Sequence, residues 1–236
     1  MIKDLIFDLG FHIGQDTEFY LKKGFRVVAI DANPILIEEG KAKFAKAIAE
    51  RRLVLINVGI GEKTETLSFY VNKTHSEWSS FDPKIGATRG EYYLIDVPVV
   101  TLESIIGDFG VPYYLKVDIE GHDFIAIKSL RGQGKPQYVS IENGHDFMID
   151  ELYQQGYSKF KFINQKYVRD IRLTPPAKEG VYVDHVFVPG ASGPFGEELP
   201  GEWLSKEAVT KLSNDYWQNP QRNDSIHGWY DLHASL

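Results

Sequence analysis

Short β-rich runs alternate with helical stretches in the first 143 residues, and this alternation restricts the chain to few folds. The β-rich runs cover 5–10, 26–32, 52–58, 113–119 and 137–143, and helical patterns lie between them at 17–24, 35–52 and 123–130. This order predicts successive β-α-β units, which build a parallel sheet with helices on both faces. We therefore expect an α/β, doubly wound fold.

The sequence after residue 143 predicts how this sheet ends. We expect a helix at 148–156 and then two β-like runs, 159–164 and 182–190, joined by a loop that contains two prolines. These two runs are expected to close the sheet as an antiparallel pair. We place the domain at residues 1–190 and expect the remaining stretch, 191–236, to pack on it as an extension, because it is too short to fold alone.

Composition fits one domain and excludes several functions. The 236 residues are 43% hydrophobic, which suffices for one sizeable core. The 33 acidic residues outnumber the 26 basic ones, and the formal charge of −7 argues against nucleic-acid or anionic-membrane partners. The absence of cysteine excludes a thiolate nucleophile and a disulfide framework. No apolar run approaches the length of a membrane span, so we expect a cytoplasmic protein.

A turn with two glycines, DLGFHIGQD at 8–16, follows the first predicted strand. In a parallel sheet such a turn faces the ligand crevice, and glycine lets the backbone approach a ligand closely. The spacing Gly-x-x-x-Gly lacks the middle glycine that makes room for the pyrophosphate of a nicotinamide or flavin dinucleotide. The acidic residues on both sides of the turn suit a ligand with an amino group and a positive centre.

The second predicted strand ends at Asp31, where a carboxylate can accept hydrogen bonds from both hydroxyls of a ribose. A nucleoside joined to a positive centre describes S-adenosylmethionine, which we predict as the cofactor. Its expected contacts come from the turn and from this strand end: Asp8, Gly10, His12, Gly14, Asp16, Thr17, Asp31 and Ala32.

Three further segments, with this turn, resemble the FkbM family of S-adenosylmethionine-dependent methyltransferases. They are TLE at 101–103, KVDIEG at 116–121 and IK at 127–128. The family's Asp-x-Gly-Ala-Asn-x-Gly turn corresponds to residues 8–14, where Phe11 and His12 depart from it, and Asp31 stands where the family usually has Glu before Pro. The resemblance covers roughly residues 5–190. It implies a class I, Rossmann-like fold with a seven-stranded, mostly parallel sheet, and methyl transfer to oxygen.

The KVDIEG segment supplies the candidate catalytic residues. Asp118 and Glu120 end a strand expected at the centre of the sheet, so they face the same crevice as the glycine turn. Methyl transfer is an in-line displacement that needs alignment and a base for the acceptor hydroxyl. We expect Asp118 at the cofactor and the methyl-transfer centre, Glu120 on the acceptor side, and His122 as a proton relay. Glu142, at the next strand end, is a further candidate base.

Purely structural roles are the alternative for two of these residues. Glu120 could instead tie the strand end to the following helix, and His122 could lie in solvent at the helix start.

A long irregular stretch, 72–96, joins the β-like runs at 67–71 and 97–102. Loops of this size are usually lids or binding loops, or they are disordered. Its aromatic residues and serines favour a lid, and we expect Ser79 and Ser80 near the cofactor. The alternative is a surface loop whose aromatic residues cover the core.

The favoured function is transfer of a methyl group from S-adenosylmethionine to a hydroxyl oxygen of a small molecule or glycan, with no metal. One alternative is a metal-assisted O-methyltransferase in which Asp118, Glu142 and Asn143 hold a hard cation. Another is a nucleotide-binding module without chemistry. A nicotinamide-dependent oxidoreductase is disfavoured by the missing glycine.

Overall fold

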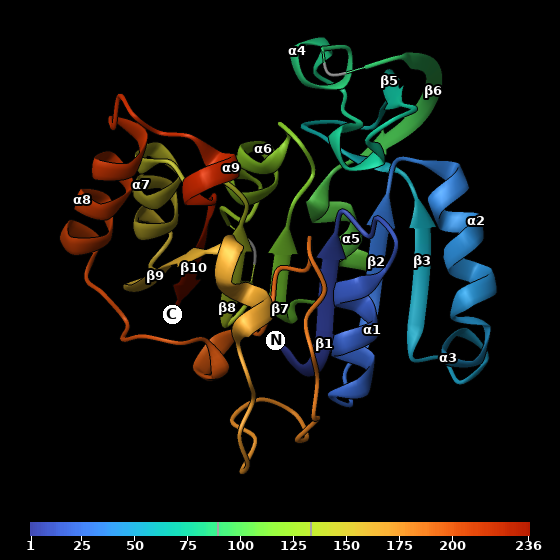
Figure 1. Ribbon diagram of the computed structural model, residues 1–236. Coiled ribbons are helices and arrows are strands. Elements are labelled where there is room, and N and C mark those ends of the chain that lie inside the picture. The colour runs from blue at the N-terminus through green and yellow to red at the C-terminus, as the bar shows by residue number, and fades with distance from the viewer. Residues whose placement is uncertain (89, 133) are drawn as a thin grey trace.

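The chain forms a seven-stranded main sheet and a three-stranded small sheet, seen in the computed structural model of residues 1–88, 90–132 and 134–236 (Figure 1). The strand order is β3-β2-β1-β7-β8-β10-β9 in the main sheet and β4-β6-β5 in the small sheet. The strands are β1 (Ile2–Leu9), β2 (Arg26–Asp31), β3 (Leu53–Asn57), β4 (Gly59–Ile60), β5 (Glu65–Asn72), β6 (Tyr92–Val100), β7 (Pro112–Val117), β8 (Tyr138–Ile141), β9 (Lys159–Asn164) and β10 (Tyr230–Ser235).

The helices connect and cover these strands. The α-helices are α1 (Gln15–Lys22), α2 (Pro34–Lys43), α3 (Ala45–Ala49), α4 (Pro83–Gly86), α5 (Leu102–Phe109), α6 (Asp123–Lys128), α7 (Asp146–Gln154), α8 (Lys206–Trp217) and α9 (Asp224–His227). Short 3-10 helices are η1 (Ser76–Trp78), η2 (Gln165–Asp170) and η3 (Gly196–Glu198). The helix predicted at 35–52 is divided into α2 and α3 at Phe44, whose backbone leaves helical geometry.

The main sheet has the predicted mixed character. β1 pairs in parallel with β2 and β7, β2 pairs in parallel with β3, and β7 pairs in parallel with β8. β10 alone runs the other way, antiparallel to both β8 and β9. The expectation of a doubly wound, mostly parallel seven-stranded sheet with antiparallel pairing near its C-terminal end is therefore confirmed.

The two faces of the sheet carry two hydrophobic cores. Along β1, Leu5, Phe7 and Leu9 belong to one core and Ile6 to the other, because successive strand residues point to opposite faces. The first core packs against α5, α6, α7 and α8. The second packs against α1, α2, α3 and the segment that contains Phe195. Residues are buried on both faces, as a parallel sheet requires.

The C-terminal segment differs from the prediction. Residues 182–190 form no strand, and the antiparallel partner of β9 is β10, which comes from the segment expected to pack outside the domain. Leu232 and Ala234 of β10 are buried in the first core. The segment 191–236 therefore completes the main sheet, because its strand β10 lies between β8 and β9.

The small sheet stands over the carboxyl-terminal ends of β1, β2, β3 and β7 (Figure 1). The stretch 72–96 is less irregular than expected, since 92–96 belong to β6 and pair with β5. Its middle part folds back on β5, because Tyr70 and Ser80 exchange two backbone hydrogen bonds. The middle part, 73–91, is called the lid segment below, and the structure describes all of it except residue 89.

None of the helices in the described part of the chain is long and apolar enough to cross a membrane.

Candidate active site

A cavity of about 830 Å³ lies at the carboxyl-terminal ends of the main strands. Its walls come from the turn after β1, the ends of β2, β7 and β8, the lid segment, and the C-terminal segment near 189–192 and 224–231. Ligands of open α/β sheets bind at this edge, where the strand order reverses beside β1 and β7. The cavity is therefore the candidate active site.

Gly10 allows the turn after β1 to approach the end of β7. Its φ is +88°, and a Cβ there would lie 1.8 Å from the carbonyl oxygen of Asp118, so no other residue fits. Several NH groups of the turn are used inside the protein. Those of Gly10 and Phe11 donate to Ile30, and that of Gly14 donates to Phe11.

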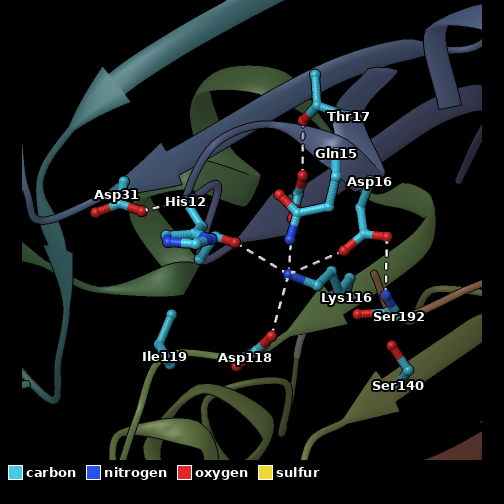
Figure 2. Close-up of polar contacts among 12 residues, drawn as sticks. His12, Gln15, Asp16, Thr17, Asp31, Lys116, Asp118, Ile119, Ser140 and Ser192 are labelled. Carbon is cyan, nitrogen blue, oxygen red and sulfur yellow. Dashed lines mark hydrogen bonds and ion pairs between the residues drawn. The ribbon is translucent and has the colours of Figure 1, made fainter. Parts of the chain in front are cut away.

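Lys116 is a buried cation beneath this turn, at the centre of Figure 2. Its Nζ donates to the carbonyl oxygen of Gly10 at 3.0 Å and lies 3.2, 3.7 and 3.5 Å from the carboxylates of Asp8, Asp16 and Asp118. Burial works against the charge of Lys116, but the three carboxylates outweigh it and raise its pKa well above the usual value. This ion cluster joins the ends of β1 and β7 to α1.

Three predicted cofactor ligands lie below the cavity wall. Thr17 Oγ1 donates to Asp8 at 2.6 Å, and Asp16 accepts the backbone NH of Ser192 at 2.9 Å (Figure 2). Burial raises the pKa of Asp16 to about 7, against the opposing effect of Lys116. Asp8, Asp16 and Thr17 are not among the described lining residues, so their side chains hold the turn and the C-terminal segment in place. Gly14 is likewise placed as the left-handed N-cap of α1.

Asp31 lies in the cavity wall at the end of β2, next to Ala32. Its two carboxylate oxygens accept the backbone NH groups of His12 and Asn33, each at 2.8 Å. Burial raises its pKa to about 6, and these two hydrogen bonds oppose that rise. The hydrogen bonds fix the direction of the carboxylate relative to the glycine turn.

The turn after β7 is organised by Asp123, whose carboxylate accepts the NH groups of Ile119 and Gly121 at 3.0 Å. Asp123 therefore ties the end of β7 to α6. This is the role that was considered as an alternative for Glu120. Glu120 has a φ of +45°, a conformation that a residue with a long side chain rarely adopts. Asp118, Glu120 and His122 all line the cavity.

His122 is held by two contacts. Its Nδ1 lies 2.8 Å from the carbonyl oxygen of Ile60, and its ring stacks on Phe81 with centroids 5.0 Å apart. Because a carbonyl oxygen only accepts, Nδ1 carries the proton, and in the neutral ring Nε2 is the acceptor.

The lid segment contacts the turns after β1 and β7. Ser76 lies 2.9 Å from His12 Nε2, and Ser80 Oγ donates to the carbonyl oxygen of Glu120 at 2.5 Å. Ser79 lines the cavity, but its Oγ accepts the NH of Asn72. Ser80 does not belong to the described lining, so it acts as a link between the lid segment and the turn after β7.

The end of the cavity beside β8 and β10, called the far end below, contains residues that the sequence interpretation missed. Asp231 and Trp229 line the cavity, although they come from the presumed extension. Asp231 is 5% exposed, and its Oδ1 has no hydrogen-bond partner within the part of the chain that the structure describes. The alternation of polar and apolar residues in YDLHAS at 230–235 is the signal that predicts such a strand.

Carboxylate oxygens of Asp118, Glu120 and Glu142 gather at this far end, within 4.8 Å of one another. Burial raises the pKa of Glu142 well above its usual value, and the neighbouring charges of Asp118 and Glu120 raise it further. Among the described lining residues, seven are Asp or Glu and one, Lys84, is Lys or Arg. Acidic side chains therefore outnumber basic ones in the described lining of the cavity.

Two methyltransferases of known structure are similar to this chain at low identity. The methyltransferase FkbM from Methylobacillus flagellatus KT is 21% identical, with a TM-score of 0.42, over 60% of this chain and 33% of its own. A precorrin-6y C5,15-methyltransferase from Geobacter metallireducens is 12% identical, with a TM-score of 0.42, over 98% of this chain and 78% of its own. This chain thus spans about a third of the M. flagellatus protein. No curated protein matches the sequence.

Family membership is decided by the sequence profile of the methyltransferase FkbM domain. That profile matches residues 8–159, which is more than half of the chain. The matched region contains the glycine turn, Asp31 and the KVDIEG segment, the residues on which the resemblance rests. The chain therefore belongs to the FkbM family of methyltransferases.

Proposed function

We propose that the protein transfers the methyl group of S-adenosylmethionine to a hydroxyl oxygen of a small molecule or glycan. The observation that carries the proposal is the glycine turn after β1, which borders the cavity beside the carboxylates of Asp31 and Asp118 while four of its own NH groups donate to protein oxygens. Family membership supports methyl transfer, and the turn supports the choice of cofactor.

The turn does not offer the anion site that a dinucleotide needs. A pyrophosphate is bound by free NH groups at a helix N-terminus. Here the NH groups of Gly10, Phe11, His12 and Gly14 donate to protein oxygens, and three carboxylates lie close to the turn. A ligand with an ammonium group and a sulfonium suits these charges.

Asp31 fits the ribose of the same ligand. Its carboxylate lies in the cavity wall, and each oxygen keeps acceptor capacity beyond the one backbone NH that it binds. In the proposed complex Asp31 accepts the ribose hydroxyls, while Gly10 and Ala32 border the nucleoside.

When bound, the cofactor supplies the methyl group on a positive sulfur. The protein aligns the acceptor oxygen with that methyl group and removes the hydroxyl proton. We assign Asp118, which is next to both the turn and Lys116, to orienting the methyl-transfer centre. Glu120 orients the acceptor hydroxyl from the turn after β7.

His122 is the candidate base with the best-defined geometry. The carbonyl oxygen of Ile60 holds the proton on Nδ1, so Nε2 of the neutral ring is available to accept the hydroxyl proton. Phe81 fixes the plane of the ring. In this proposal Glu120 orients the acceptor hydroxyl, and His122 then accepts the proton of that hydroxyl.

The lining at the far end supports a hydroxylated acceptor. Asp231, Glu142, Asn143 and Gln165 supply hydrogen-bond acceptors, and Trp229 supplies a flat apolar face. Hydroxyl-rich molecules need both kinds of surface, whereas the excess of carboxylates repels the phosphates of a nucleic acid.

Calorimetric titration tests the choice of cofactor. We expect the purified chain to bind S-adenosylmethionine and its demethylated product with one site each, and to show no heat with NADH. Micromolar binding of NADH without binding of S-adenosylmethionine would refute the proposal.

A further inference from the structure

The carboxylates at the far end of the cavity form a cluster that sequence interpretation saw only in part. Asp118 and Glu142 follow neighbouring parallel strands, and Glu120 reaches the same point from the left-handed turn. Their oxygens lie within 4.8 Å of one another. A calcium ion with ligands at about 2.4 Å places opposite ligands about 4.8 Å apart, so the three carboxylates can surround one ion.

A second observation comes from β10. Leu232 lies opposite Ile141 in the antiparallel ladder, so the preceding residue of β10, Asp231, lies beside Glu142. Asp231 lines the same cavity at 5% exposure, and Oδ1 lacks a hydrogen-bond partner among the described residues. A buried carboxylate without a partner is costly, and a cation is the ligand that removes the cost.

The third observation concerns the positive charge that lies beside Asp118. Lys116 is the cation nearest to Asp118, at 3.5 Å, and it is already shared with Asp8 and Asp16. Within the described residues, the positive charge beside Asp118 is thus divided among three carboxylates.

We propose that Asp118, Glu120 and Glu142 bind one divalent cation at the acceptor end of the cavity, beside the buried carboxylate of Asp231. All of the donors are oxygens, which Mg²⁺, Ca²⁺ and Mn²⁺ prefer. Cation binding by itself does not depend on the proposed function. Its use does, because an ion at this place would bind the acceptor hydroxyl and make its proton easier to remove.

Mn²⁺ titration followed by electron paramagnetic resonance tests the site in the full chain without cofactor or acceptor. We expect one Mn²⁺ per chain, displaced by excess Mg²⁺ or Ca²⁺. Glu142→Gln and Asp231→Asn should each weaken Mn²⁺ binding at least about tenfold. The matched control is Glu77→Gln, which removes a carboxylate from the lid-segment wall of the same cavity and should leave Mn²⁺ affinity unchanged.

Melting temperature provides the second measurement. Without metal, Glu142→Gln should melt at or above the wild-type temperature, because it removes repulsion. Mn²⁺ should raise the melting temperature of the wild type and of Glu77→Gln by more than that of Glu142→Gln. The proposal is overturned if Mn²⁺ stays free at millimolar concentration, as for a cluster that receives an ammonium group instead, or if all three variants bind it equally. Titration with S-adenosylmethionine in the same metal-free buffer tests the proposed function separately, since a failed cation site leaves that binding intact.

Discussion

At the end of the cavity beside β1 and β2, Asp8, Asp16 and Asp31 each bind a partner within the protein. At the end beside β8 and β10, the carboxylates of Glu142 and Asp231 are crowded by other acids. Asp231 keeps a buried oxygen with neither a hydrogen bond nor an ion pair in the described structure, whereas the oxygen of Asp8 that lacks a hydrogen bond is paired with Lys116. The first end is a preorganised site whose shape is set before any ligand arrives. The second gathers acidic side chains, and in our proposal a bound cation neutralises them.

The first end depends most on Lys116. Lys116→Met removes the cation from a buried cluster and should lower the free energy of unfolding by about 3–5 kcal/mol, because three carboxylates lose their partner. Urea unfolding at about pH 7 measures the loss. The exposed Lys41→Met is the control and should change stability by about 0.5 kcal/mol or less.

Acid should partly rescue Lys116→Met, because Asp16 already has a pKa of about 7 and becomes neutral when the pH falls below it. A stability deficit as large at about pH 5 as at pH 7 would mean that the lysine stem, and not its charge, holds the cluster together.

A backbone contact is the next largest effect. Gly10→Ala should cost about 2–4 kcal/mol, because the methyl group meets the carbonyl oxygen of Asp118 and the left-handed backbone adds strain. Gly107→Ala in α5 is the control, since a Cβ there has open space, and it should stabilise the helix by about 0.5–1 kcal/mol. Equal melting temperatures for the two variants would show that the ends of β1 and β7 are not in close contact.

The two ends differ in how far the sequence predicts them. The glycine turn, Asp31 and the KVDIEG segment are short local patterns, so the sequence places them at one sheet edge correctly. The site at the far end joins Glu142 to Asp231, which are 89 positions apart in the chain. Their proximity depends on β10 entering between β8 and β9, and 182–190 has the stronger β-pattern although it forms no strand.

The sequence also does not predict which partners the polar side chains of the turn bind. Asp8, Asp16 and Thr17 lie in the predicted turn, but only three-dimensional packing shows that their side chains face Lys116 and the C-terminal segment instead of the cavity.

The pH dependence of cofactor binding tests Asp31. With a pKa of about 6, Asp31 loses its charge as the pH falls from 7 to 5, so its ability to accept two ribose hydroxyls declines. Affinity for S-adenosylmethionine should fall by up to about tenfold over this range. In Asp31→Asn the affinity should be lower at pH 7 and should change less with pH. A parallel decline in both proteins would assign the titration to another group.

The smallest effect concerns the lid segment. Ser80→Ala removes the hydrogen bonds to Glu120 and Asp82 and should lower stability by about 1 kcal/mol, with faster proteolysis within 73–91. Ser68→Ala on exposed β5 is the control. Unchanged cleavage in Ser80→Ala would show that the link to Glu120 does not hold the segment.

The division of the cavity is tested most directly by the affinity of two variants for S-adenosylmethionine in metal-free buffer, measured by calorimetry. Asp31→Ala should weaken binding by about 1.5–3 kcal/mol, the value of hydrogen bonds to a charged group. Asp231→Asn should change it by less than about 0.5 kcal/mol, because Asp231 lies at the opposite end of the cavity, where we propose that the acceptor binds. Equal losses in the two variants, or none in Asp31→Ala, would contradict the account.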